Sequence, residues 1–419
     1  MKTQNSKSFL PAFWLVILLF SASAFAFSAE PFIEFRGTVV DKTTRTPLAF
    51  AGISVAGTNM TTVTNTEGEF SLKILTSVAQ PKIKVQYIGF ISETVTVEEL
   101  TKNKNRIELT PRTVELPEVS VISIDAEELM RSVFEKVSDN YATNTTQMTA
   151  FYRETIKNNS SYVSLSEAVL DVLKEPAGSY KNDVARFYKA RKKVDYNKLD
   201  TLIFKLMGGP YNSLNLDVIK HPEYVFTEDV FKNYVFTFEK STHLDNQLIY
   251  IINFTQNSSV PDPYYRGKIY VDAKSLAIKS VVFSLNLDNK EAAASLFIVK
   301  KPLNARVVPV VADYRIDYAE KDGKWYYNYS RIELALKIIW KKKLFHTTYH
   351  STIEMAVTDW NLPDDPKAFR HGERLKPNVI VSDEPIGFKD PEFWGDFNVI
   401  EPEKSIETAI KKIKKQMEK

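Results

Sequence analysis

Residues 35–70 read FRGTVVDKTTRTPLAFAGISVAGTNMTTVTNTEGEF. Apolar and polar residues alternate here over short runs, and turn residues separate one run from the next. Gly68 ends the turn signal at 65–68, where a hairpin needs a residue that tolerates positive φ, and glycine has no Cβ to clash. Short strands separated by turns at intervals of about ten residues are typical of a β-sandwich.

The same alternation continues to Leu109 and supplies further strands at 83–87 and 94–97. The ordered motifs resemble those of the carboxypeptidase-regulatory-like domain; they are FRGTVVD (35–41), PLAFA (47–51), GT (57–58), TNTEGEF (64–70) and YIGF (87–90). The resemblance implies a transthyretin-like sandwich of about seven strands over residues 32–110, with no catalytic residue of its own. It also implies an envelope protein of Bacteroidetes, where the module often precedes other domains, including those of outer-membrane receptors.

The N-terminus carries an export signal. Lys2 and Lys7 precede the apolar run 9–20, and Ala24 and Ala26 give the small-x-small pattern that a signal peptidase accepts. We therefore expect residues 1–26 to be a signal peptide, with an uncleaved anchor as the alternative. No later run reaches the length of about 18 apolar residues that a membrane span needs. The sequence predicts an exported protein of the periplasm or the outer-membrane periphery, with no transmembrane span after cleavage.

A proline-punctuated linker is predicted at 111–124, and its ELPEVSV (115–121) is similar to the segment that joins this module to the plug of such receptors. A helix is predicted from Asp125 to Tyr141. Asp125 and Glu128 form a capping pair, and apolar residues at helical spacing form one stripe that faces a core.

Long alternating runs then dominate residues 147–359, with helical or irregular sequence at 198–221. Turn signals at 272–275 and 320–323 separate successive strands. The pattern predicts a large antiparallel meander that forms a curved sheet or half-barrel within a domain at 125–360. The hairpin at 267–278 resembles one in periplasmic lipoprotein-carrier-like half-barrels.

The tail, residues 361–419, begins as a proline-rich passage and ends in an amphipathic helix striped by Ile406, Ile410, Ile413 and Met417. We expect this helix to pack on the main domain, with a membrane or partner contact as the alternative. The predicted fold class is mainly β: an N-terminal seven-stranded transthyretin-like β-sandwich, then a helix, a large antiparallel curved sheet and a C-terminal helix.

Catalytic and metal chemistry find little support. The absence of cysteine excludes disulfides, thiolate metal sites and thiol nucleophiles. His346 and His350 are near neighbours, but on a strand they lie about 13 Å apart, too far to chelate one metal. Asp262, Asp313, Asp317 and Glu333 could flank a cleft, although positions on solvated strand faces explain them better. We therefore predict no catalytic residue, no metal site and no cofactor.

Aromatic residues give the one positive signal of binding. Tyr264, Tyr265, Trp325 and Tyr327 lie near predicted turns and strand ends, where exposed rings stack on sugars or peptides. The alternative is that these rings form cross-strand pairs in the core.

These observations favour a non-enzymatic envelope protein with a binding or assembly role. Its partner would be another envelope protein or a surface ligand, namely a glycan, peptide or lipid. Nucleic acid is excluded, because 55 Lys and Arg against 52 Asp and Glu give a net charge of only +3. The alternatives are an envelope hydrolase acting on peptide or glycan, and a carrier of an apolar molecule in the half-barrel. An open concave face would favour the carrier, and one plugged by its own side chains would favour a scaffold.

Overall fold

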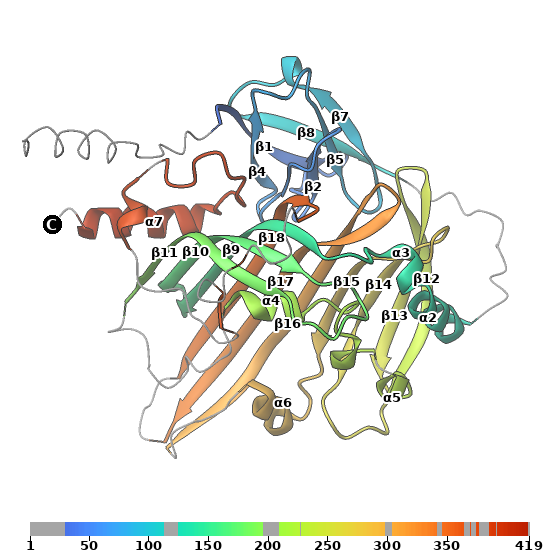
Figure 1. Cartoon of the computed structure of the whole chain (residues 1–419). Coiled ribbons are helices and arrows are strands. Elements are labelled where there is room, and N and C mark those ends of the chain that lie inside the picture. The colour runs from blue at the N-terminus through green and yellow to red at the C-terminus, as the bar shows by residue number, and fades with distance from the viewer. Residues whose placement is uncertain are drawn as a thin grey trace, which may run out of the picture.

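The computed structural model describes residues 30–112, 125–195, 209–226, 228–297, 304–341, 346–363, 369, 374–376, 385–390 and 392–417. The predicted signal peptide and most of the predicted linker (113–124) lie outside the described residues. The described part is mainly β, as predicted, and Figure 1 shows a small N-terminal sandwich above a much larger sheet.

The N-terminal sandwich is built from short strands: β1 (Phe32–Asp41), β2 (Gly52–Val55), β3 (Thr61–Val63), β4 (Glu69–Leu75), β5 (Lys82–Gln86), β6 (Phe90–Ile91), β7 (Glu93–Thr96) and β8 (Asn105–Pro111), with the 3-10 turn η1 (Val97–Glu99). Two four-stranded sheets have the orders β4-β1-β8-β6 and β3-β2-β5-β7. Val39, Phe70, Leu72, Ile83 and Leu109 fill the interior without exposed surface. The predicted β-sandwich is confirmed, with the two-residue strand β6 in addition to the seven expected strands.

The turn before β4 depends on glycine. Gly68 has a φ of 72°, and a Cβ at this position would lie 2.7 Å from the carbonyl oxygen of Val39. Both the backbone angle and the close approach of β1 exclude a side chain here, which confirms the expectation from the sequence.

Two helical pieces follow: α2 (Ala126–Glu135) and α3 (Val137–Asn140). The Asp125 carboxylate caps α2 by accepting a hydrogen bond from the Glu128 amide at 2.7 Å, as predicted. Leu129, Met130 and Val133 of α2 are buried. The single predicted helix is divided because Lys136, with φ −92° and ψ 11°, leaves the helical geometry.

The large sheet has ten antiparallel strands: β9 (Thr146–Asn158), β10 (Ser161–Lys174), β11 (Val184–Val194), β12 (Tyr234–Leu244), β13 (Gln247–Gln256), β14 (Tyr265–Asp272), β15 (Ile278–Leu285), β16 (Ala305–Lys321), β17 (Lys324–Trp340) and β18 (Thr347–Asn361). Their spatial order is β11-β10-β9-β18-β17-β16-β15-β14-β13-β12. The last strand of the meander therefore pairs with the first, and β11 and β12 remain as the two edges of an open sheet.

The turns predicted at 272–275 and 320–323 are confirmed, and each is stabilised by residues within the turn itself. The Asp272 carboxylate accepts hydrogen bonds from the amides of Lys274 (3.1 Å) and Ser275 (2.7 Å), and Asp322 and Gly323 adopt φ of 52° and 75° in the β16–β17 hairpin.

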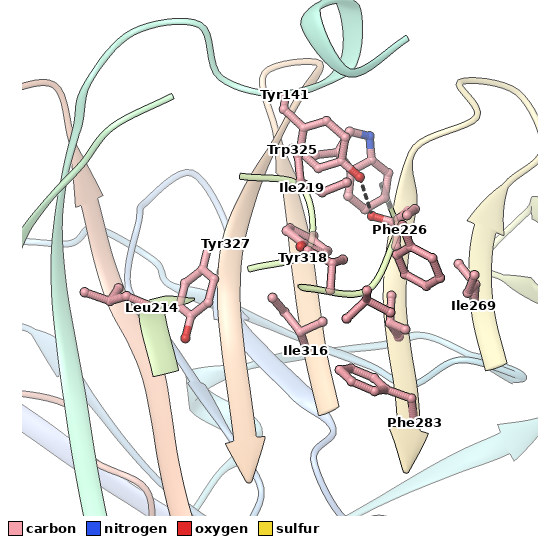
Figure 2. Packing of buried hydrophobic residues seen from close by; sticks show 14 of the residues in the cluster. Tyr141, Leu214, Ile219, Phe226, Ile269, Phe283, Ile316, Tyr318, Trp325 and Tyr327 are labelled. Carbon is pink, nitrogen blue, oxygen red and sulfur yellow. Dashed lines mark hydrogen bonds between the residues drawn. The ribbon is translucent and has the colours of Figure 1, made fainter. Parts of the chain in front are cut away.

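One face of the large sheet, here called the inner face, surrounds the main apolar core. Side chains from both edge strands, such as Ala185 and Tyr234, belong to this one cluster, so the sheet curves around it. The short helices α4 (Pro210–Asn215) and α5 (Glu228–Phe231) contribute to the filling, and the 3-10 turn η2 (Pro222–Tyr224) lies between them in the chain. Figure 2 shows Leu214, Ile219 and Phe226 packed against strand residues in this core.

The opposite, outer face carries the sandwich and the tail. Val63 of the sandwich and Trp394 and Ile400 of the tail share a buried cluster with Phe151 and Tyr329 of the sheet. The tail contains the 3-10 turn η4 (Pro385–Phe388) and the helix α7 (Lys404–Met417), and Figure 1 shows α7 beside β9, β10 and β11. The amphipathic α7 is confirmed, and it packs on the main domain through Ile406, which is 2% exposed.

A further helix, α6 (Lys290–Phe297), lies between β15 and β16. None of the described helices has the length and apolar character that a membrane crossing requires.

Candidate functional site

Among the described residues, the inner face around Tyr318 and Tyr327 is filled by side chains of the chain itself. The Tyr318 hydroxyl donates a hydrogen bond to the Asp217 carboxylate at 2.8 Å, and the Tyr327 hydroxyl donates to the carbonyl of Ser213 at 3.1 Å. The residues around Tyr141 and Trp325 line a cavity of about 40 Å³, which has room for little more than one water molecule. This part of the concave face is therefore plugged.

Two predicted binding residues lie in this core. Trp325 and Tyr327 are 3% and 4% exposed, so their faces are covered by protein. Their burial favours the alternative that the sequence left open, in which the rings support the sheet.

The other two predicted binding residues pack against the same core and are half-buried. The ring of Tyr264 contacts Tyr234, with centroids 6.0 Å apart, and the ring of Tyr265 contacts Phe283 at 5.3 Å. Ligand stacking on these rings stays a prediction, and their observed partners are protein rings.

Buried charges join the segments that fill the inner face to the strands of the sheet. The Lys174 ammonium lies 2.7 Å from Asp183 and 2.8 Å from Asp217. Lys220 pairs with Asp183 at 3.2 Å. Burial tends to lower the pKa of Lys174, but Asp217 and Asp183 outweigh it, and the pKa lies above its ordinary value.

The outer face carries a second and longer set of buried charges, which we call the charge row. It consists of Arg191 on β11, Glu167 on β10, Arg153 on β9, Glu354 on β18 and Arg331 on β17. Each is directly opposite the next in the strand pairing. Positive and negative side chains thus alternate across five neighbouring strands.

Every neighbouring pair in the charge row is in contact. The nitrogen–oxygen distances are 2.6 Å for Arg191–Glu167, 2.8 Å for Glu167–Arg153, 3.2 Å for Arg153–Glu354 and 2.8 Å for Glu354–Arg331. The side chains of Arg153 and Glu167 are only 3% and 1% exposed, so solvent screens these interactions weakly.

The tail and the sandwich cover the charge row. Arg153 donates a hydrogen bond to the carbonyl of Ile400 at 2.8 Å, and Arg191 donates to the carbonyl of Gly387 at 3.1 Å. The ring of Phe50 from the sandwich lies 5.2 Å from the Arg331 guanidinium and stacks on Tyr329. The charge row therefore joins all three parts of the chain.

The electrostatic balance keeps these groups ionised. Burial tends to raise the pKa of Glu167, but Arg191 and Arg153 outweigh it and hold the pKa below its ordinary value. Burial tends to lower the pKa of Arg153, and Glu167 and Glu354 raise it above the ordinary value.

Next to the charge row lies a polar cavity of about 520 Å³, here called the tail cavity. Its floor is formed by β9, β17 and β18, and its rim by the sandwich and the start of α7; the polar lining residues include Thr66, Glu67, Arg153, Thr155, Lys157, Arg331, Glu333, His350, Thr352, Glu354, Glu403 and Ser405. Thr66 donates a hydrogen bond to Glu403 at 2.8 Å, which ties the rim together. The volume is in the range of small-molecule sites, although the lining is more polar than usual.

The carboxylates singled out from the sequence do not form one cluster. Asp313 accepts a hydrogen bond from Ser284 at 2.6 Å, and Asp317 accepts one from Arg315 at 2.7 Å. Glu333 lines the tail cavity and contacts Arg331, whereas Asp262 lies in the loop between β13 and β14. Their placement gives no paired acid and base.

His350 lies on β18 and lines the tail cavity, and His346 comes directly before that strand. Among the described residues, no three His, Asp or Glu side chains are arranged to hold a metal ion.

Comparison with known proteins bears on the N-terminal sandwich. Residues 35–121 match the family model of the CarboxypepD_reg-like domain. This match confirms the domain expected from the motifs, and it spans the described sandwich. No curated protein matches the chain.

Among solved structures, the chain has a weak likeness to the crystal structure of a DUF1329 family protein from Desulfovibrio piger. The sequence identity is 13%, the TM-score is 0.24, and the alignment covers 59% of this chain and 99% of the other. A likeness at this level supports no inference about fold or activity.

The charge row was not found from the sequence. Its five members were hidden among the many charged residues of alternating strands, which normally face solvent. The available signal was that all five lie in the region of long alternating runs at 147–359, where a charged residue is unusual if both faces of the sheet are covered.

Proposed function

We propose that this protein is an exported, non-enzymatic protein of the bacterial envelope with a binding or assembly role. Export is supported by the lysine-led apolar run at the N-terminus. The regulatory-like domain supports a non-enzymatic role for the sandwich, because it is an accessory module with no catalytic residue of its own. The observation that carries the proposal is the filled inner face, because a plugged half-barrel cannot hold a large apolar cargo.

The outer face supports binding rather than catalysis. Glu354 accepts from Arg153, Arg331 and the Tyr329 hydroxyl, so its oxygens are already occupied. Glu403 and Glu67 accept hydrogen bonds from Thr66 and from the Lys404 amide. Carboxylates engaged in this way hold the sandwich, the sheet and the tail together. The tail cavity between them is a polar recess that can take part of a partner or ligand.

The test is recovery of a partner or ligand with the full-length protein. The protein is crosslinked in intact cells of its native bacterium, purified from the envelope fraction, and analysed by mass spectrometry. Thr352→Trp fills the tail cavity, and Thr237→Trp, at an exposed position of β12, makes the same change away from it. We expect a specific envelope component that Thr352→Trp loses and Thr237→Trp keeps. Recovery of no partner and no ligand by the wild-type protein would contradict the proposal.

A hydrolase is the second candidate, because the tail cavity gathers Glu67, Glu333, Glu354 and Glu403. Its test is a screen of the purified protein against peptide and glycan substrates. Turnover that Glu333→Gln abolishes would establish the enzyme and overturn the binding proposal.

A further inference from the structure

A second large cavity, lined in part by Phe50, lies between the sandwich and the sheet. Its volume is about 520 Å³. The sandwich contributes β2, β3 and β5 with their loops, and the sheet contributes the β12–β13 turn together with parts of β15, β16 and β17. We call it the interdomain cavity.

Hydrogen bonds between the sandwich and the sheet fix the walls of this cavity relative to each other. Thr61 donates a hydrogen bond to the carbonyl of Val357 at 2.9 Å. On the opposite wall, Lys84 and Gln86 donate to the Asp245 carboxylate at 2.8 and 3.1 Å. Asn59 bonds to the backbone of Trp360 and accepts from Lys321. The cavity is therefore built into the fold.

Most charged groups that line the interdomain cavity have a partner in the protein. Lys84 pairs with Asp245 at 2.8 Å, and Arg315 pairs with Asp317 at 2.7 Å. Lys279 differs. In the part of the chain that the structure describes, its ammonium lies over the ring of Trp325, 4.9 Å from the centroid, and pairs with no carboxylate.

Lys279 is partly shielded from bulk water. It follows Ile278, which lies in the inner core without exposed surface, and its own side chain is only partly accessible. Burial lowers the pKa of Lys279 to about 8, although Asp317, Glu320, Asp245 and Asp272 oppose this shift. The ammonium is thus poorly solvated and incompletely compensated, which is the condition under which a bound anion gains most.

We propose that the interdomain cavity binds a small molecule with a carboxylate or phosphate group, and that Lys279 is the residue that pairs with this group. Lys84 and Arg315 on the neighbouring walls are engaged with carboxylates and add hydrogen-bond donors. The contact with the Trp325 ring, 4.9 Å from the ammonium, fixes one side of Lys279, and Lys279 itself lines the cavity. This site is separate from the tail cavity, so it stands or falls independently of the function proposed above.

The test is calorimetric titration of the full-length protein at pH 7 with two probes, inorganic phosphate and succinate. We expect binding of at least one probe, weakened tenfold or more in Lys279→Gln and unchanged in Lys82→Gln, a lysine on the exposed side of β5. Binding of phosphate alone would assign a phosphate ligand, and binding of succinate alone would assign a carboxylate ligand. Failure of both probes to bind, or equal binding by Lys279→Gln, would overturn the proposal.

A second measurement needs no variant, so it remains decisive if Lys279→Gln does not fold. The wild-type protein is labelled by reductive methylation at pH 8, and the rate at each lysine is followed by peptide mass spectrometry. A pKa of about 8 makes Lys279 partly neutral at this pH, so its amine reacts readily. We expect the probe that binds to slow labelling of Lys279 several-fold and to leave Lys82 unaffected. An equal rate with and without the probe would count against the site.

Discussion

Glu167 lies between two arginines in the middle of the charge row, and its ionisation is the most consequential single property of the outer face. Removing one partner of a buried ion pair leaves the other charge without compensation, which costs about 3–5 kcal/mol. An exposed pair is worth far less, since water solvates its members individually.

We therefore predict that Glu167→Gln lowers the free energy of unfolding by about 3–5 kcal/mol. The control is Glu127→Gln, which breaks the exposed pair with Arg131 on α2, whose side chains are 48% and 47% exposed. That change should cost about 0.5 kcal/mol or less. Urea unfolding at pH 7 measures both, and equal effects would show that the buried row carries no special cost.

The same residue gives a pH dependence with a definite sign. Burial opposes ionisation of Glu167, but the arginines hold its pKa below the ordinary value. The stabilisation from this group is complete above the pKa of the unfolded chain, about 4.3. It is lost as the pH falls through the lower pKa of the folded protein.

We predict that the difference in unfolding free energy between the wild-type protein and Glu167→Gln shrinks steadily below about pH 4.3. Urea midpoints measured at several pH values between neutrality and the acid limit of folding would show this convergence. A difference that stays constant with pH would mean that Glu167 has the same pKa in the folded and the unfolded protein, and a difference that grows as the pH falls would mean that its folded pKa is raised.

At the scale of elements, the charge row also specifies strand register. A slip of β9 by two residues against β18 would place Arg153 opposite Thr352 or Ala356 instead of Glu354, which is its observed partner. The charges would then be buried without partners. A slip of two residues keeps the apolar side chains on the inner face, so the apolar pattern alone does not exclude it, and the charge row favours the observed register.

Local elements were predictable because their signals are local. The cap at Asp125, the turn at Asp272 and the stripe of α7 each depend on residues within a few positions of one another. The charge row depends on the pairing of β9 with β18, and Arg153 and Glu354 are 201 positions apart. Alternation in each strand correctly predicted the sheet, but it could not show that the tail and sandwich cover the outer face.

We predict that the helix α7 can be released without unfolding the sheet. Ile406 packs against Leu165 and Phe388, and burying such a side chain contributes about 1.5–3 kcal/mol. Ile406→Asp should therefore raise amide deuterium exchange in 404–417 roughly tenfold or more. Lys412→Asp changes an exposed residue of the same helix and should have little effect. Loss of protection throughout β9–β11 would show that the tail and sheet unfold as one unit.

At the scale of the whole molecule, Phe50 provides the main ring contact between the sandwich and the sheet. Phe50 stacks on Tyr329 and lies beside the guanidinium groups of Arg315 and Arg331. Truncating a well-packed phenylalanine costs about 3–5 kcal/mol at most. Truncation of Phe50 should weaken the interaction between the sandwich and the sheet rather than the sandwich itself, because Phe50 lies outside the sandwich core.

We predict a single calorimetric unfolding transition for the wild-type protein and two separated transitions for Phe50→Ala. Lys82→Ala, which changes an exposed residue of the sandwich, should keep the single transition. One unsplit transition at lower temperature in Phe50→Ala would show that the remaining contacts are sufficient to couple the two parts.

The open sheet leaves β11 and β12 with backbone groups that another strand could pair with. The tail covers part of one edge, where the Leu375 amide donates to the carbonyl of Ala185 at 2.8 Å. The sandwich covers part of the other, where the Gly89 amide donates to the carbonyl of His243 at 2.8 Å. The sandwich and the tail thus cover parts of opposite edges of the sheet and limit self-association through them. A fragment that lacks either end should be prone to aggregate through the uncovered strand, even where its own core is intact.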